Sequence, residues 1–141
     1  MTVLIDTNVI LDYVLKREPL AQYAFDCLER LLTNKDKYKS HLTASTITDI
    51  YYVTRRSLHN NELARGVVEK LLNAFNIASV DKNDCLVALT YSIGDYEDAL
   101  QTQCACRIKA KHIITNNIRD FTNSPINAIT PKDFLSNQFM D

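Results

Sequence analysis

The chain is poor in the residues that form linkers and sharp breaks. Its 141 residues include only two glycines and three prolines, and no tryptophan. No low-complexity segment, internal repeat or linker-like stretch interrupts it. Because 46% of the residues are hydrophobic, there is enough apolar material for one substantial core. We therefore predict a single domain spanning residues 1–141.

Long hydrophobic runs are also missing. The apolar runs are a few residues long, far short of the roughly 20 residues that span a bilayer. No basic start leads into an apolar stretch ending at small residues, so a signal peptide is not expected. The four cysteines fit a reduced chain better than a disulfide scaffold. These features predict a cytoplasmic protein with no membrane partner.

The cysteine spacing gives little support to a structural zinc site. Cys104 and Cys106 form a C-x-C with His112 nearby, but such a site usually takes two close ligand pairs. Cys27 and Cys85 each stand far from any other cysteine in the sequence. The favoured interpretation is that the thiols pack as small apolar groups.

Neither sign of charge dominates. The net charge is −1 and the isoelectric point is about 6.3, so the overall charge does not indicate a nucleic-acid-binding protein. An anionic substrate would have to be held by local positive charge or by a metal ion.

Short apolar segments alternate with longer amphipathic ones along the whole chain. Strands are expected at residues 2–6, 41–43, 77–80, 112–115 and 128–129. Helices are expected at 8–15, 20–32, from a cap at Ser45 or Thr46 to 58, then 61–72, 81–91, 95–110, and from Pro131 onward. This alternation predicts an α/β fold with a short, mostly parallel sheet covered on both faces. Ligands of such sheets bind beyond the carboxyl ends of the strands.

Acidic residues occupy four positions where a strand ends or a helix begins. Asp6 follows the first strand, Asp49 lies among apolar residues, Asp98 follows a cap at Asp95, and Asp120 follows the late strand. Taken singly, each is explained by capping or by the helix dipole. If the sheet is parallel, however, all four can converge at one edge. Clustered carboxylates repel one another, and a hard divalent ion such as Mg²⁺ or Mn²⁺ relieves that repulsion.

Four stretches, in this order, resemble the PIN-domain ribonucleases, including the toxins of VapBC-type toxin–antitoxin pairs. They are "LIDTNVILDYVL", "ASTITDIYYV", "EDALQTQCA" and "IITNNIRDF", and "SPINAITPKDFL" closes the chain as it often does in this family. The resemblance implies a three-layer α/β/α sandwich whose acidic pocket binds Mg²⁺ or Mn²⁺ and cuts RNA. It also implies a possible antitoxin protein and a homodimer, for which the helices at 20–32 or 63–72 would offer apolar surface.

The resemblance assigns roles to individual residues. Asp6, Asp49 and Asp98 match metal-binding acids, and these three with Asp120 form the predicted catalytic set. The residues predicted to line the pocket are Asn8, Thr115 and Asn117. Many relatives carry Glu where this chain has Asp49 and Asp where it has Asn117, and those with Asn there tend to have the acid found here as Asp120.

The predicted activity is metal-assisted hydrolysis of RNA phosphodiester bonds. The two departures, Asp49 and Asn117, favour an alternative: a catalytically weak PIN fold that binds RNA or a protein. A receiver-like signalling domain is a further alternative, but it would show an early acidic pair and a late lysine, which this chain lacks.

Seven basic residues around the motifs are candidate phosphate contacts, although each taken alone is better explained as part of a solvated face. They are Lys16, Arg17, Arg55, Arg56, Lys109, Lys111 and Arg119. Tyr51 and Tyr52 would be able to stack on bases, but their helical spacing favours packing in the core.

Overall fold

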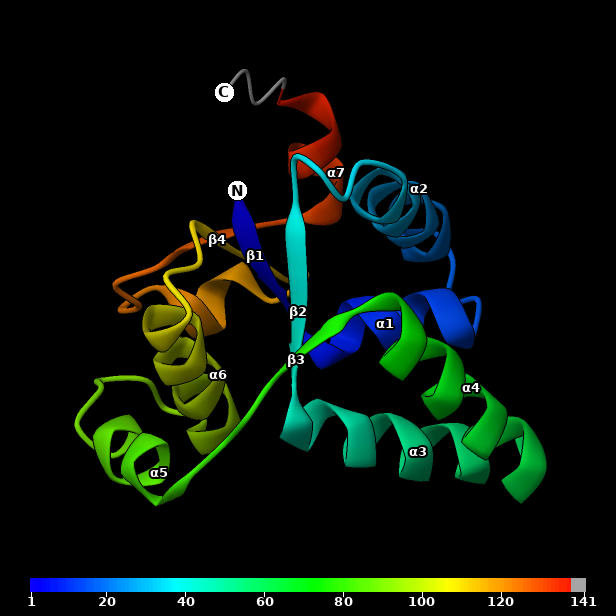
Figure 1. Cartoon of the computed structure of the whole chain (residues 1–141), viewed down its shortest axis with the longest axis horizontal. Helices are drawn as coiled ribbons and strands as arrows, with labels where there is room; N and C mark the ends of the chain where they lie inside the picture. Colours follow the sequence, from blue (N-terminus) through cyan, green and yellow to red (C-terminus); the bar gives the residue numbers. More distant parts are fainter. Residues whose placement is uncertain (138–141) are drawn as a thin grey trace.

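The computed structural model describes residues 1–137 and consists of a five-stranded sheet between two groups of helices (Figure 1). The strands are β1 (Thr2–Ile5), β2 (Lys39–Thr43), β3 (Asn76–Ala78), β4 (His112–Ile114) and β5 (Asn127–Ile129). Their order is β3-β2-β1-β4-β5, and every neighbouring pair is parallel. The predicted parallel sheet covered on both faces is confirmed.

Within residues 1–137, seven α-helices and one short 3₁₀ helix connect and cover the strands. They are α1 (Thr7–Val14), α2 (Leu20–Thr33), α3 (Ala44–Leu58), α4 (Asn61–Ala74), α5 (Lys82–Ala88), α6 (Tyr96–Arg107), η1 (Ile118–Phe121) and α7 (Pro131–Ser136). Pro131 is the first residue of its helix, as predicted. The predicted helix at 81–91 is shorter, because Asp81 is its cap and the helix ends at Ala88. No helix in the described part of the chain is both long and apolar enough to cross a membrane.

The start of α3 differs from the prediction. Its cap is Thr43, the last residue of β2, whose hydroxyl accepts a hydrogen bond from the backbone N–H of Thr46 at 3.3 Å. The predicted cap at Ser45 or Thr46 is wrong, because both residues already lie inside the helix. Because the strand leads into the helix with no intervening loop, α3 begins at the carboxyl edge of the sheet.

The two faces of β1 divide the core into two layers. Alternate residues of a strand point to opposite faces. Val3 and Ile5 therefore pack with α1 and α2, whereas Leu4 packs with Ala105 of α6 and with Ile113. In Figure 1, α1, α2 and α4 lie on one side of the sheet and α5 and α6 on the other. The result is the predicted three-layer arrangement.

The strand order reverses direction at β1. From β1 the chain adds β2 and β3 on one side, and then crosses to β4 and β5 on the other. In open parallel sheets, the crevice beyond the carboxyl ends of the strands at such a reversal is the usual ligand site. Asp6 follows β1 and Thr115 follows β4, so both residues border this crevice.

Candidate functional site

Asp6 is buried at the carboxyl end of β1, with only 5% of its surface exposed. Its carboxylate accepts hydrogen bonds from Gln101 Nε2 at 2.8 Å and from Thr115 Oγ1 at 2.7 Å. Although Asp6 occupies the N-cap position of α1, its side chain makes no cap bond within the described residues. The capping interpretation of Asp6 is therefore wrong, because this side chain is directed to α6 and to the end of β4.

The pKa of the Asp6 carboxyl is raised above its ordinary value, chiefly by burial. Hydrogen bonds from Gln101, Thr115 and the Thr7 backbone oppose this rise, and the negative charge of Asp120 adds to it. Asp6 is thus a buried acid whose charge is partly stabilised by neutral donors. Asp120, an exposed residue of η1, is close enough to act on it electrostatically.

Asp98 lies in the first turn of α6 and is a second member of the same group. The cap of that helix is Asp95, whose carboxylate accepts a hydrogen bond from the Asp98 backbone N–H at 3.0 Å. Burial raises the pKa of Asp98 to about 7, and the charges of Asp6, Asp95 and Asp120 contribute to the rise. Asp98 therefore belongs to an acidic cluster with Asp6 and Asp120.

Glu97 is an acid of this cluster that was not among the residues predicted from the sequence. The pKa of Glu97 is raised to about 7 by the partial burial of its carboxyl group, then by a hydrogen bond to Asp49 and by the charges of Asp49 and Asp6. Asp49 lies in the second turn of α3, so this contact joins α3 to the start of α6. The available signal was the pair of adjacent acids in "DYEDAL", of which only Asp98 was selected.

The residues predicted to line the pocket are arranged around Thr115. The Thr115 hydroxyl accepts a hydrogen bond from the Asn117 backbone N–H at 3.0 Å, and Asn8 Nδ2 lies 3.5 Å from it. Thr115 in turn donates to Asp6. Asn117 itself is exposed, so the contact that it makes here is through its backbone.

Gln101 is a further residue that the sequence reasoning missed. It is 1% exposed, and while its Nε2 donates to Asp6, its Oε1 has no hydrogen-bond partner among the described residues. A buried amide oxygen without a partner is costly unless water or an ion satisfies it. Its position in "EDALQ", one helical turn after Asp98, was the only sequence signal.

The donor set suits a hard cation, since it consists of carboxylate, hydroxyl and amide oxygens. Within residues 1–137, however, no three histidine, cysteine, aspartate or glutamate side chains are placed to hold a metal ion as they stand. Glu97 and Asp120 are exposed side chains on the rim of the cluster, so they can change rotamer without disturbing the core. The residues therefore fit a hard divalent ion in chemistry, and side-chain rotation is needed to complete its ligand shell.

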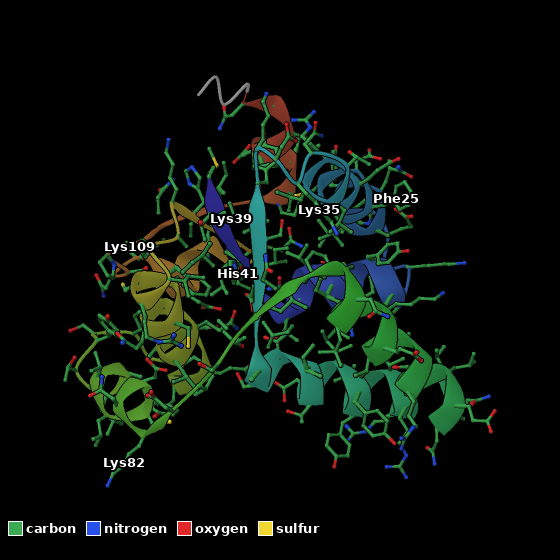
Figure 2. The ribbon with its side chains drawn as sticks, viewed as in Figure 1. Phe25, Lys35, Lys39, His41, Lys82 and Lys109 are labelled. Atoms are coloured by element: carbon green, nitrogen blue, oxygen red, sulfur yellow. The ribbon has the colours of Figure 1, made fainter. Side chains whose placement is uncertain are left out.

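The basic residues considered as phosphate contacts lie at different ends of the sheet. Arg119 lines a polar hollow of about 180 Å³ next to Asp95 and Asp120. Lys109 and Lys111 precede β4, whereas the acids follow the strands, so these two lysines lie at the opposite end of the sheet. Lys109 is labelled in Figure 2. Their candidacy as phosphate contacts beside the acids is not supported, because β4 separates them from the acids, and the interpretation as part of a solvated face is favoured.

Cys104 and Cys106 are directed to different neighbours, since residues two apart on a helix do not share a face. The Cys104 thiol lies 3.9 Å from the Ser79 carbonyl oxygen, and the Cys106 thiol lies 3.6 Å from the Tyr91 hydroxyl. Cys27 and Cys104 are buried, while Cys85 and Cys106 are only partly so.

Comparison with solved structures gives the same fold at low sequence identity. The VapBC2 complex from Rickettsia felis, bound to a promoter DNA fragment, contains a chain with a TM-score of 0.71 and 18% identity, covering 92% of this chain and 98% of that one. A toxin–antitoxin complex from Klebsiella pneumoniae gives 0.68 and 21%, covering 92% and 97%. VapC20 of Mycobacterium tuberculosis, described as a sarcin-ricin loop cleaving toxin, gives 0.62 and 11%, covering 79% and 86%.

Sequence comparison identifies the family. No curated protein sequence matches this chain. A family model of the PIN domain, in contrast, matches residues 2–119, which is most of the sequence. This match agrees with the resemblance of the four motifs and leaves no support for the receiver-like alternative. The chain belongs to the PIN domain family.

Proposed function

We propose that this protein is a metal-dependent nuclease that hydrolyses phosphodiester bonds of RNA. The observation that carries the proposal is the cluster of acids from four separate segments: Asp6, Asp49, Glu97 with Asp98, and Asp120. Burial, together with the negative charges of neighbouring acids, raises the pKa of both Glu97 and Asp98 to about 7. Membership of the PIN domain family, and the description of one structural neighbour as a sarcin-ricin loop cleaving toxin, support the same proposal.

Asp6 and Asp98 would hold Mg²⁺ or Mn²⁺, with Asp49, Glu97 and Asp120 completing the acidic surroundings. A bound ion of this kind neutralises phosphate charge and makes water a better nucleophile. Because the shorter Asp49 meets Glu97 across the cluster, Glu97 would supply the reach that Asp49 lacks relative to a glutamate. Glu97 would thereby compensate for Asp49, which is one of the two departures from the family pattern that favour a catalytically weak fold.

The surrounding residues hold the acids in place. Gln101 and Thr115 fix the orientation of the Asp6 carboxylate through two hydrogen bonds, so its oxygens do not rotate freely. Near neutral pH, Asp98 and Glu97 are partly protonated in the absence of an ion. Binding of a cation would therefore release protons, and the affinity for Mn²⁺ should rise as the pH is raised through about 7.

Cleavage of RNA by the full chain tests the proposal. Asp98→Asn and Asp6→Asn should each lower the cleavage rate by at least about 100-fold with Mg²⁺ or Mn²⁺, because each removes a charged ligand. The matched control is Asp36→Asn, which changes an exposed aspartate in the loop before β2 and should leave the rate unchanged. If wild-type cleavage does not exceed that of the Asp98 variant, the nuclease reading is wrong and the binding-module alternative is favoured.

We also propose an antitoxin protein as a partner, which two of the similar solved structures contain by description. The supporting observation in this chain is an apolar groove of about 590 Å³ between α1, α2 and α4. Its lining includes Tyr13, Phe25, Leu28, Val67 and Leu71. Phe25 is 43% exposed and lies on the outer side of α2 (Figure 2), where an apolar segment of a partner can cover it.

A further inference from the structure

A second polar hollow, of about 420 Å³, lies between the end of α3 and the start of α4. It is lined by Tyr52, Arg55, Arg56, His59 and Asn61, which we call the α3 surface. The lining thus combines one aromatic ring, two guanidinium groups, an imidazole and an amide. This composition differs from the mostly apolar lining of the groove between α1, α2 and α4.

The side chains of the α3 surface are presented to solvent and partly held in position. Tyr52 is 58% exposed, and the ring of Tyr51 packs against its edge with centroids 5.2 Å apart. Arg55 Nε donates a hydrogen bond to Asn61 Oδ1 at 2.8 Å, which directs the guanidinium across the hollow. The interpretation of Tyr52 as a core residue is wrong, because α3 buries its opposite side, at Thr46, Ile50 and Thr54.

The positive charge of this surface is not compensated locally. In the part of the chain that the structure describes, neither Arg55 nor Arg56 forms an ion pair with a carboxylate. The whole chain has a net charge of −1, so these arginines are a local concentration of positive charge. Such a patch attracts an anionic partner, and guanidinium groups match phosphate geometry well.

The α3 surface is continuous with the acidic cluster. Asp49, Tyr52 and Arg56 are separated by three and four residues, so they share one face of α3. The rise from Asp49 to His59 along the helix is about 15 Å. Asp49 contacts Glu97 of the cluster. One helix face therefore leads from the acids to the hollow.

We propose that the α3 surface binds single-stranded RNA next to the acidic cluster, with Tyr52 stacking on a base and Arg55 and Arg56 contacting phosphates. The proposal rests on the proposed nuclease function, for which it specifies how the substrate is held. An unpaired strand fits because its bases are open to stacking, whereas a duplex conceals them. An acidic protein segment would use the arginines but would offer no base to the exposed ring.

Binding is measured without cleavage by fluorescence anisotropy, using the full chain, EDTA and a labelled RNA of about 12 nucleotides. Tyr52→Leu should weaken binding roughly 5- to 150-fold, whereas Tyr52→Phe, which keeps the ring, should bind like wild type. Removing both guanidinium groups, with Arg55→Gln and Arg56→Gln, should weaken binding and reduce the slope of log Kd against log salt by about 1.4. Arg56→Gln alone, which keeps the Arg55–Asn61 hydrogen bond, should reduce the slope by about half as much.

The matched control is Lys82→Gln, which neutralises an exposed lysine at the start of α5 (Figure 2) and should not change RNA affinity. Poly-glutamate competes as a polyanion without bases. If Tyr52→Leu weakens the binding of RNA but not of poly-glutamate, the proposal holds. If it weakens neither, or if both arginine variants bind RNA as tightly as wild type, the α3 surface is not the RNA site.

The RNA-binding proposal and the nuclease proposal can fail independently of each other. If wild-type protein binds RNA through Tyr52 and Arg56 but cleaves none with Mg²⁺ or Mn²⁺, the RNA-binding proposal is supported and the nuclease proposal is wrong. If the protein cleaves RNA in a way that depends on Asp98, and the α3 variants change neither binding nor cleavage, the nuclease proposal is supported and the α3 surface is not the RNA site.

Discussion

At the scale of single residues, the main feature is that acids are held near one another with few positive charges between them. Asp6 is stabilised by the neutral donors Gln101 and Thr115, and Asp98 is surrounded by Asp6, Asp95 and Asp120. In most folded proteins a buried carboxylate has a cationic partner or several hydrogen bonds. Asp98 has no such cationic partner among the causes that shift its pKa, so its ionised form is disfavoured in the folded protein.

This cost predicts a pH-dependent effect of Asp98→Asn on stability. The raised pKa of Asp98 means that the folded protein binds a proton more readily than the unfolded chain does. Between the ordinary pKa of 3.8 and about 7, the free energy of unfolding should therefore fall as the pH rises. In EDTA, Asp98→Asn should be more stable than wild type at about pH 8, by on the order of 1 kcal/mol once solvent screening is allowed for.

Thermal unfolding measured from about pH 4 to pH 8 checks this prediction, and the difference between the two proteins should vanish at the acidic end. If Asp98 is a metal ligand as proposed, adding Mn²⁺ at the alkaline end should stabilise wild type more than the variant, which lacks that ligand. A variant that is less stable than wild type throughout would show that Asp98 has a favourable partner instead.

At the scale of elements, α5 and α6 are joined by a polar contact. Asp84 of α5 is fully buried and completes a capping box with Asp81. It also accepts hydrogen bonds from Arg107 Nε at 3.0 Å and Gln103 Nε2 at 3.3 Å. Burial raises the pKa of Asp84, but the hydrogen bonds, that from Arg107 foremost, keep it below its ordinary value. This contact fixes the helix that carries Glu97, Asp98 and Gln101.

Arg107→Met should lower the free energy of unfolding by about 2–3 kcal/mol at neutral pH, because it leaves the buried Asp84 charge without its cation. Urea denaturation followed by circular dichroism measures this change. Arg65→Met, which replaces an exposed arginine of α4, is the matched control and should change stability little. An equally small effect at Arg107 would mean that Asp81 and Gln103 alone satisfy Asp84.

At the scale of the whole molecule, the acidic cluster, the α3 surface and the apolar groove have different chemical characters. The cluster lies where the strand order reverses, whereas the groove lies over α1, α2 and α4 (Figure 1). Substitutions in the groove can therefore test partner binding through α2 and α4 separately from any contact with the acidic cluster. The homodimer stays a prediction, for which the exposed Leu63 and Leu72 of α4 are available surface.

The groove predicts how an antitoxin would bind. In co-expression with a candidate antitoxin, Phe25→Glu should reduce co-purification strongly, since it places a charge in the apolar lining. Leu89→Glu changes a leucine that is 69% exposed and lies outside the groove, so it should not reduce co-purification. Equal recovery with both variants would exclude the groove as the docking site.

By itself the sequence determined the features that depend on local patterns. Continuous apolar runs marked the short parallel strands, amphipathic spacing marked the long helices, and Pro131 marked the start of the last one. Acids placed directly after a strand or at a helix start were recognisable for the same reason, because parallel strands bring their carboxyl ends to one edge.

The tertiary structure alone decided which of these side chains meet. Glu97 and Gln101 belong to the cluster only because α6 packs against β1 and β4, and Tyr52 is exposed only because α3 buries its other side. Lys109 and Lys111 are close to Thr115 in sequence, yet a strand carries them to the opposite end of the sheet. Sequence spacing specifies direction along one element, whereas contact between elements depends on packing, which a single sequence does not display.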